Sequence, residues 1–224
     1  MSKRFSASNA AQLMSCPGSA HLELSIPGWV EPEDNDQAPA RAKGTMLHEY
    51  FKLVGELSPT DMSKMVAALA YVAELRQNRR FKTLVEHTFT ADWLRTRPQT
   101  TPDLVLYTAD ELHIIDYKSG TIPVSPIGNH QLMYYAACAA HLAPKAKVVE
   151  LHIVQPWAKN GISSWVMTTK ELGQFMLDAR TAEQKILNKD TTLSPSDHCT
   201  FCPANPHSRS DKGSPLCPKM MNLL

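Results

Sequence analysis

The sequence predicts a mixed α/β (α+β) fold, in which helices flank a central mixed sheet and a cysteine-rich C-terminal clip follows. Segments rich in β-branched and aromatic residues cluster in the middle of the chain, between residues 82 and 169. Segments with helical periodicity lie on both sides of this region. From Thr191 onward the chain is rich in Pro, Ser and Cys and shows no periodicity, so we expect a tail without a core of its own.

Each element can be placed from its local pattern. Helices are expected over 6–15 (capped by Ser6 or Ser8), Gly44–Gly55, Asp61–Asn78, 128–143 and 169–188. Strands are expected over 82–94, in both arms of the hairpin 103–119, over 147–157 and over 162–169. The acidic, Pro-rich segment 26–40 is expected to form an exposed, mobile loop.

The composition bounds the class of protein. A chain of 224 residues is expected to form one domain with appendages. A net charge of +1 argues against bulk-electrostatic binding of nucleic acid, although it leaves room for a local basic groove. Apolar runs fall short of the ~18 residues of a transmembrane helix, and the N-terminus lacks the apolar core of a signal peptide. We therefore expect a cytoplasmic protein that does not bind membranes.

The hairpin "DLVLYTADELHIIDYKSG" places charges at the ends of two buried strands. If the turn centres on Ala109–Asp110, paired residues have numbers that sum to 219, and Asp103 faces Asp116. Two carboxylates directly opposite on neighbouring strands repel, which a cation between them would relieve. Carboxylate oxygens suit Mg²⁺ or Mn²⁺, and Lys118 lies on the same face as Asp116. The alternative is a surface salt bridge at a hairpin end.

Four of the five cysteines are arranged as one near the N-terminus and three in the tail. Cys199 and Cys202 form a CxxC pair, Cys217 follows, and Cys16 is the remaining candidate for a fourth partner. In a reducing compartment this pattern favours a metal over disulfides. Four thiolates suit a 4Fe–4S cluster, and a structural Zn²⁺ is the alternative, with His198 or His207 as substitute ligands. Cys138, among alanines on a helix, is expected in the core.

The segments "TTPDLVL" and "HIIDYKSG" resemble the Pro-Asp…Asp-x-Lys core of the PD-(D/E)xK nuclease superfamily. The resemblance implies a restriction-endonuclease-like sheet in which Asp103 and Asp116 bind a metal ion. It also implies that the Tyr117 carbonyl contributes to the metal site and that Lys118 assists catalysis.

Two further segments are similar to the RecB-like branch of this superfamily. "GTMLHEYF" implies that His48 is a further metal ligand and that Glu49 supports the site. "NHQLMYYAAC" implies that Gln131 and Tyr135, one helical turn apart, serve the catalytic site near the DNA. Taken alone, His48 would be a half-buried helix histidine, and the second pattern a packed stripe. Glu86 is a weaker candidate for a supporting carboxylate.

The cysteine distribution resembles that of RecB-like nucleases with an iron–sulfur cluster, such as CRISPR-associated exonucleases and small phage-borne relatives. It implies that Cys16 joins the three tail cysteines around the cluster, although the insertion before Cys217 is longer than usual. Residues 1–190 would then form the nuclease core, and residues 191–224 a tail that closes the cluster.

Together these features predict a Mg²⁺- or Mn²⁺-dependent DNA exonuclease acting on single-stranded ends in recombination or DNA processing, in the host cytoplasm if phage-encoded. A helicase or recombination protein is a possible kind of partner. Candidate phosphate-binding bases are Arg41, Lys43, Arg76, Arg79, Arg80, Arg95 and Arg97. One alternative is a non-catalytic nucleic-acid-binding accessory protein with a structural Zn or Fe–S site. Another is a zinc-ribbon-like interaction protein whose acidic residues are incidental.

Overall fold

The computed structural model describes residues 5–24, 59–77, 81–159, 161–202, 204–205 and 217–221. The chain divides into two compact units. The sheet unit comprises residues 33–89 and 101–172, and the cysteine unit comprises residues 1–32, 90–100 and 173–224. The loop expected over 26–40 and the helix expected over Gly44–Gly55 lie outside the described residues.

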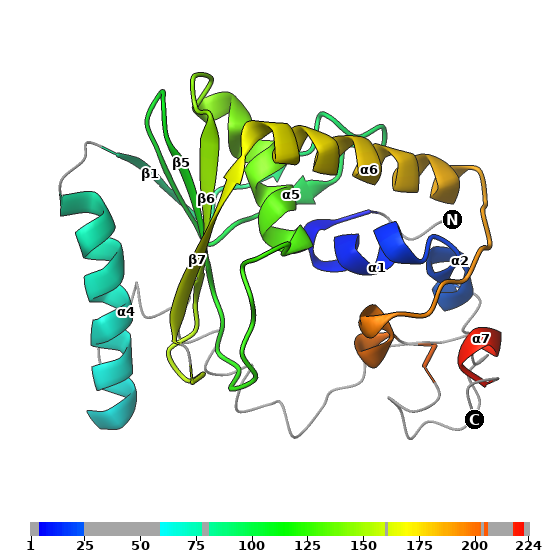
Figure 1. The fold of residues 1–224 in the computed structure, drawn as a ribbon, viewed down its shortest axis with the longest axis horizontal. Coiled ribbons are helices and arrows are strands. Elements are labelled where there is room, and N and C mark those ends of the chain that lie inside the picture. The colour runs from blue at the N-terminus through cyan, green and yellow to red at the C-terminus, as the bar shows by residue number, and fades with distance from the viewer. Residues whose placement is uncertain are drawn as a thin grey trace. The chain divides into compact units, whose positions relative to one another are not determined.

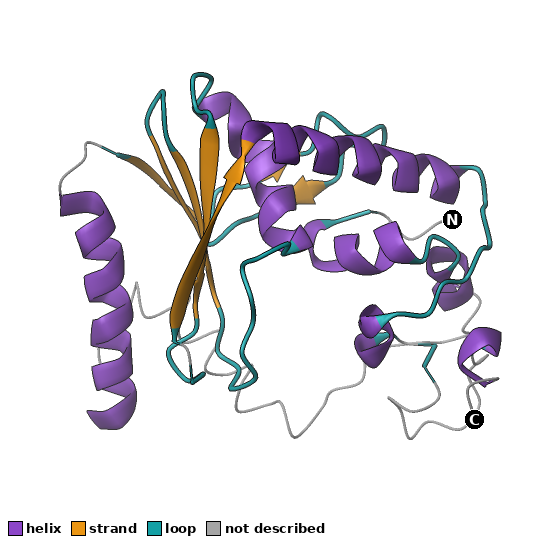
Figure 2. Ribbon diagram, viewed as in Figure 1, coloured by secondary structure: helices purple, strands orange, loops and turns teal. Residues whose placement is uncertain are grey.

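A five-stranded mixed sheet forms the centre of the sheet unit (Figure 2). Its strand order is β1-β4-β5-β6-β7. The strands are β1 (Lys82–Val85), β4 (Leu104–Tyr107), β5 (Leu112–Tyr117), β6 (Val148–Val154) and β7 (Ile162–Thr168). Strands β5 and β6 are parallel and all other neighbours are antiparallel. With helices on both faces, this arrangement confirms the predicted α/β fold with a mixed central sheet.

Helices α4 (Pro59–Gln77) and α5 (His130–Ala139) lie on opposite sides of this sheet (Figure 1). Helix α5 continues into a 3₁₀ turn, η2 (Ala140–Leu142), and connects the parallel strands β5 and β6. Such a connection is expected because parallel strands need a long crossover, which a helix usually provides. Helix α6 (Thr169–Leu187) follows β7 and runs from the sheet unit into the cysteine unit.

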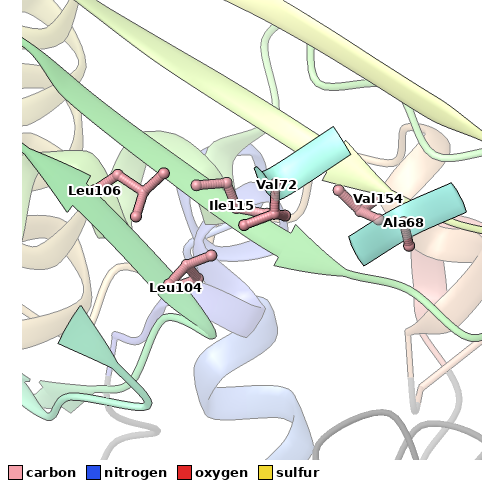
Figure 3. Close-up of a cluster of buried hydrophobic side chains, with 6 residues drawn as sticks. All are labelled: Ala68, Val72, Leu104, Leu106, Ile115 and Val154. Atoms are coloured by element: carbon pink, nitrogen blue, oxygen red, sulfur yellow. The ribbon is translucent and has the colours of Figure 1, made fainter. Parts of the chain in front are cut away.

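An apolar cluster packs between α4 and the sheet (Figure 3). Its buried members are Ala68, Val72, Leu104, Leu106, Ile115 and Val154. Along α4, Met65 and Val72 are buried and Leu69 and Leu75 are half-buried. Because Ile115 points toward α4, its neighbour Asp116 points to the other face of the sheet, where α5 lies.

The strand expected over 82–94 is not continuous, which corrects that prediction. Strand β1 ends at Val85, and Glu86 adopts a positive φ of 46°. A non-glycine residue in this conformation turns the chain sharply, so the alternating pattern cannot continue as one strand. The chain resumes as β2 (Phe89–Thr90), which pairs with β3 (Gln99–Thr100) in a separate two-stranded sheet.

Short helices build the cysteine unit. They are η1 (Ala7–Asn9), α1 (Ala10–Ser15), α2 (Ser19–Leu24), η3 (Asp197–Phe201) and α7 (Pro218–Met221). Ser6 is the N-cap of η1, so the helix expected over 6–15 is present, with a 3₁₀ first turn. Within the described ranges, no helix combines the length and apolar character needed to cross a membrane.

Candidate active site

The hairpin has the register that the sequence predicted. Leu104 pairs with Ile115 and Tyr107 pairs with Leu112, so the paired numbers sum to 219. The Thr108 N–H donates to the Glu111 carbonyl at 2.9 Å and closes the turn. Continuing this register by one residue brings Asp103 opposite Asp116.

Backbone groups on both sides hold Asp103 in place. Its Oδ2 accepts a hydrogen bond from the Tyr117 N–H at 2.7 Å, across the β4–β5 pair. Its carbonyl accepts from the Glu86 N–H at 2.9 Å, which extends the β1–β4 pairing. Glu86, the weaker supporting candidate, is therefore the β1-side neighbour of Asp103, and its side chain is exposed.

Asp116 is a buried carboxylate, 3% exposed, with a lysine beside it. The Lys118 Nζ lies 2.8 Å from Asp116 Oδ2, and the Lys118 side chain is 27% exposed. The Lys118 N–H donates to the Val154 carbonyl at 2.9 Å, so pairing with β6 continues past the end of β5. The Lys118 ammonium group thus lies between the buried Asp116 carboxylate and solvent. Its backbone pairing with β6 holds Lys118 in this position.

Helix α5 supplies the next two members of a connected polar network. Lys118 Nζ donates to Gln131 Oε1 at 2.9 Å, and Gln131 Nε2 donates to the Tyr135 hydroxyl at 2.8 Å. Asn129 caps the helix, since its side chain accepts from the backbone N–H groups of Gln131 and Leu132. The cap sets where the helix starts, and this orients Gln131 toward Lys118.

The charges of both carboxylates reach the Tyr135 hydroxyl. Burial raises the pKa of Tyr135 above its ordinary value, and the charges of Asp116 and Asp103 raise it further, against a lowering by the Gln131 hydrogen bond. Burial followed by the charge of Asp103 likewise raises the pKa of Tyr117. Tyr135 therefore keeps its proton beside two acids that converge on it.

A buried glutamine, Gln155, fixes the loop that follows Lys118. Its Oε1 accepts from the Val124 N–H at 2.9 Å, and its Nε2 donates to the carbonyls of Gly120 and Ile122 at 2.8 and 2.7 Å. It is 3% exposed. Sequence reasoning missed this residue, although a glutamine directly after the apolar strand "LHIV" is a usable signal.

A surface hollow adjoins this loop on the sheet face that carries Asp116. Ile153 is the β6 partner of Asp116, and it lines the hollow. The lining residues are Pro123, Val124, Ser125, Ile153, Gln155, Ala158, Gly161 and Ser163. The hollow therefore lies one strand away from Asp116, on the same face of the sheet.

In the cysteine unit, the four cysteines of the predicted cluster line one small cavity together with His198. All four thiols are buried, and none is in a disulfide. N–H donors lie near three of the sulfurs: Ser194 N at 3.3 Å from Cys16 Sγ, Ser196 N at 3.4 Å from Cys199 Sγ, and Gln12 Nε2 at 3.8 Å from Cys202 Sγ. The four thiols line one cavity and are the residues that could together hold a metal ion or cluster.

His198 is also a possible ligand in this cavity. Its Nε2 lies 3.6 Å from Cys199 Sγ, and its Nδ1 forms a hydrogen bond with the Ser196 hydroxyl. Burial lowers its pKa and Asp197 opposes this, which favours a neutral ring.

Gly18 allows the two ends of the chain to approach in the cysteine unit. The Gly18 N–H donates to the Thr192 carbonyl at 3.0 Å. A Cβ at this position would lie 2.5 Å from the Thr191 carbonyl oxygen, so only glycine permits this packing. The contact joins the turn after Cys16 to the segment that leads to Cys199.

The other residues predicted from the sequence are the candidate phosphate-binding bases, Cys138, and several residues outside the described ranges. Arg97 is exposed and pairs with Asp92 at 2.5 Å, and Arg76 and Arg95 are also exposed. Cys138 is buried in α5, as predicted. The candidates outside the described residues are Arg41, Lys43, His48, Glu49, Arg79, Arg80 and His207.

A family model described as "Protein of unknown function (DUF2800)" matches residues 55–216, and the chain belongs to this family. The matched region contains Asp103, Asp116 and Lys118 as well as the CxxC pair, and it ends one residue before Cys217.

Two solved structures match most of this chain at low identity. A protein named SSO0001 is 10% identical, with a TM-score of 0.36, over 86% of this chain and 81% of that chain. An alkaline exonuclease, LHK-Exo from Laribacter hongkongensis, is 9% identical, with a TM-score of 0.34, over 83% of this chain and 92% of that chain. Because these identities and TM-scores are low, the fold is assigned from the strand order and register of this chain alone.

Proposed function

We propose that this protein is a Mg²⁺- or Mn²⁺-dependent deoxyribonuclease of the PD-(D/E)xK type that degrades DNA from single-stranded ends. The proposal rests on the strand register, which places Asp103 opposite Asp116, and on the ion pair between Lys118 and Asp116. A sheet gains nothing in stability from two facing carboxylates. The arrangement is reasonable if a cation binds between them.

The carboxylates of Asp103 and Asp116, with the Tyr117 carbonyl and His48, would hold the metal ion. The bound ion would lower the pKa of a water molecule and stabilise charge on the phosphate. Both acids have fixed positions, because Asp103 accepts the Tyr117 N–H and Asp116 is buried within β5. Fixed ligands favour catalysis because little reorganisation is needed when substrate binds.

Lys118 Nζ would polarise the attacking water or offset charge on the phosphate. Gln131 accepts a hydrogen bond from that ammonium group and would aim it. Tyr135 donates or accepts only as a neutral phenol, because burial and the two acids raise its pKa. In this proposal Lys118 faces the reacting groups, and Gln131 and Tyr135 hold it in position.

We propose that the four thiols of the cysteine unit hold a 4Fe–4S cluster, with Zn²⁺ as the competing occupant. Burial of all four thiols around one cavity supports a metal site. The cluster would tie the N-terminal segment to the tail 191–224, where Leu22, Leu193 and Met220 pack against Cys202, Ala204 and Cys217. Metal binding would then supply folding free energy to this unit.

A cleavage assay tests the nuclease proposal. Full-length protein with Mn²⁺ or Mg²⁺ is expected to shorten single-stranded DNA, and labels at the 5′ or 3′ end report the polarity. EDTA and Asp116→Asn are expected to abolish cutting. Asp110→Asn, an exposed turn residue, is the matched control and should cut normally. Binding without any cutting would favour the accessory-protein reading, and retained cutting by both Asp116→Ala and Lys118→Ala would refute the site.

Colour and metal content test the cysteine site. Protein purified without oxygen is expected to be brown, with broad absorbance near ~400 nm from thiolate-ligated iron. Stoichiometric zinc in a colourless protein would overturn the cluster assignment while keeping the site. Absence of both metals would refute the site.

A further inference from the structure

A second polar cluster lies on the opposite face of the sheet, toward α4. Parallel pairing of β5 with β6 places His113 beside Glu150, and His152 follows two residues along β6. Side chains alternate along a strand, so these three share the face of Ile115 and Val154, which pack under α4. Asp116 points away from this face. The cluster is therefore separate from the proposed nuclease site.

The potential ligand atoms of this cluster lie at metal-ligand spacing. His113 Nδ1 is 3.0 Å from His152 Nε2 and 3.5 Å from Glu150 Oε2. The three ligand atoms all lie within 4.8 Å of one another. Two nitrogen or oxygen ligands of one tetrahedral zinc ion, each about 2.0–2.1 Å from it, lie about 3.4 Å apart. Small side-chain adjustments would thus accommodate an ion.

Tyr71 on α4 orients one of the two imidazoles. Its hydroxyl lies 2.7 Å from His152 Nδ1. With the ring proton on Nδ1 donated to the Tyr71 oxygen, His152 Nε2 presents its lone pair to the other two residues. Metal-binding histidines commonly make this kind of outer hydrogen bond, which fixes the tautomer and the ring orientation.

Burial makes both rings suitable ligands. His152 is fully buried and His113 is 4% exposed, with the Phe81 ring packed edge-on 4.9 Å from the His113 ring. Burial, and next the nearby His113, lower the pKa of His152 to about 3, so its ring is neutral at physiological pH. The Glu150 side chain is 30% exposed and offers a route from solvent.

We propose that His113 Nδ1, His152 Nε2 and the Glu150 carboxylate form a binding site for a divalent transition metal ion of the zinc type. Two imidazoles and one carboxylate are the donors that zinc accepts and that Mg²⁺ does not prefer. The ion would join β5 to β6 and, through Tyr71, steady α4 on the sheet. The site is independent of the proposed nuclease function.

Zinc titration followed by NMR of the histidine ring nitrogens tests the site in full-length protein. One equivalent bound here is expected to shift the His113 Nδ1 and His152 Nε2 signals. Glu150→Gln keeps the side-chain shape and is expected to weaken zinc binding at least about 100-fold. Tyr71→Phe is expected to weaken it about 10-fold and to redistribute the His152 tautomers, which loss of packing alone would not do.

Matched variants separate this site from the others. Asp116→Asn and Glu74→Gln, an exposed glutamate on α4, should leave the zinc shifts of both rings unchanged. Zinc that shifts neither ring would overturn the proposal and leave a hydrogen-bonded pair of neutral histidines. Ring shifts that persist with wild-type affinity in Glu150→Gln would also overturn it.

Discussion

The acid site of the sheet unit and the thiol site of the cysteine unit are assembled in different ways. Asp103 and Asp116 come from the two strands of one hairpin, and β-pairing alone brings them together. Cys16 and Cys199 come from opposite ends of the chain and meet through short helices and the close approach at Gly18. One site is built on the paired strands of a sheet, and the other lies among short helices and the segments that connect them.

This difference indicates what each site contributes. Facing carboxylates cost stability, so the acid site is expected to serve chemistry. Buried thiols from the two ends of the chain line one cavity, and a metal bound there would join those segments, so the thiol site is expected to serve folding. Substitutions in the first site should therefore change activity, and substitutions in the second should change stability.

The largest expected effect is on catalysis. Asp116→Asn or Asp103→Asn should lower single-turnover cleavage by about 10³-fold, because the metal loses a charged ligand. Stability to urea should stay the same or rise by up to about 1 kcal/mol, since one of two facing charges is removed. If these variants lost stability as well as activity, the acid site would also serve folding, and the difference between the two sites would not hold.

Loss of a thiol comes next. Cys199→Ser should remove the bound metal and lower the unfolding free energy of the cysteine unit by at least about 3 kcal/mol. Metal analysis and thermal melting measure both effects. Cys138→Ala, a buried thiol in α5, is the control and should keep full metal content. A Cys199→Ser protein with normal metal content would show that Cys199 is not a ligand.

A smaller effect is expected at the glycine that allows the chain ends to meet. Gly18→Ala should cost about 1–3 kcal/mol, because the added Cβ would clash with the Thr191 carbonyl oxygen. Gly173→Ala has open space in α6 and should instead stabilise by about 0.5–1 kcal/mol. Chemical denaturation compares the two, and equal effects would contradict the close approach at Gly18.

The loop after Lys118 provides a finer test of the acid site. Gln155→Leu removes the partners of one N–H and two carbonyls, so the loop should shift and cleavage should fall about tenfold. Gln184→Leu, an exposed glutamine in α6, is the control. Unchanged cleavage by Gln155→Leu would show that the loop does not position the chemistry.

The smallest expected effect concerns Tyr135. Tyr135→Phe should lower cleavage about threefold, because Gln131 loses a hydrogen-bond acceptor. Burial and the two acids raise the pKa of this phenol above its usual ~10, so it stays protonated up to at least that pH. The pH–rate profiles of variant and wild type should therefore have the same shape between about pH 7 and 10, offset by this factor. An alkaline limb present only in the wild type would contradict this.

Several features of the acid site were predictable because they depend on local patterns. Alternation and a central turn define the hairpin register, which the paired residues Leu104 and Ile115 confirm. The i, i+4 spacing of Gln131 and Tyr135 predicts that they meet, and their side chains are hydrogen-bonded. The break at Glu86 was not predictable, because alternation in "KTLVEHTFT" gives no sign of a left-handed residue.

By itself, the sequence determined the mixed α/β class, the pairing of Asp103 with Asp116, and a set of four cysteines suited to a metal. Only the tertiary structure decided that His113, Glu150 and His152 cluster, because β5 and β6 pair in parallel across a helical crossover. It also decided that Gln155 holds the loop after Lys118. Periodicity and hairpin pairing act between near neighbours in sequence, whereas parallel pairing and loop packing depend on how distant segments are brought together.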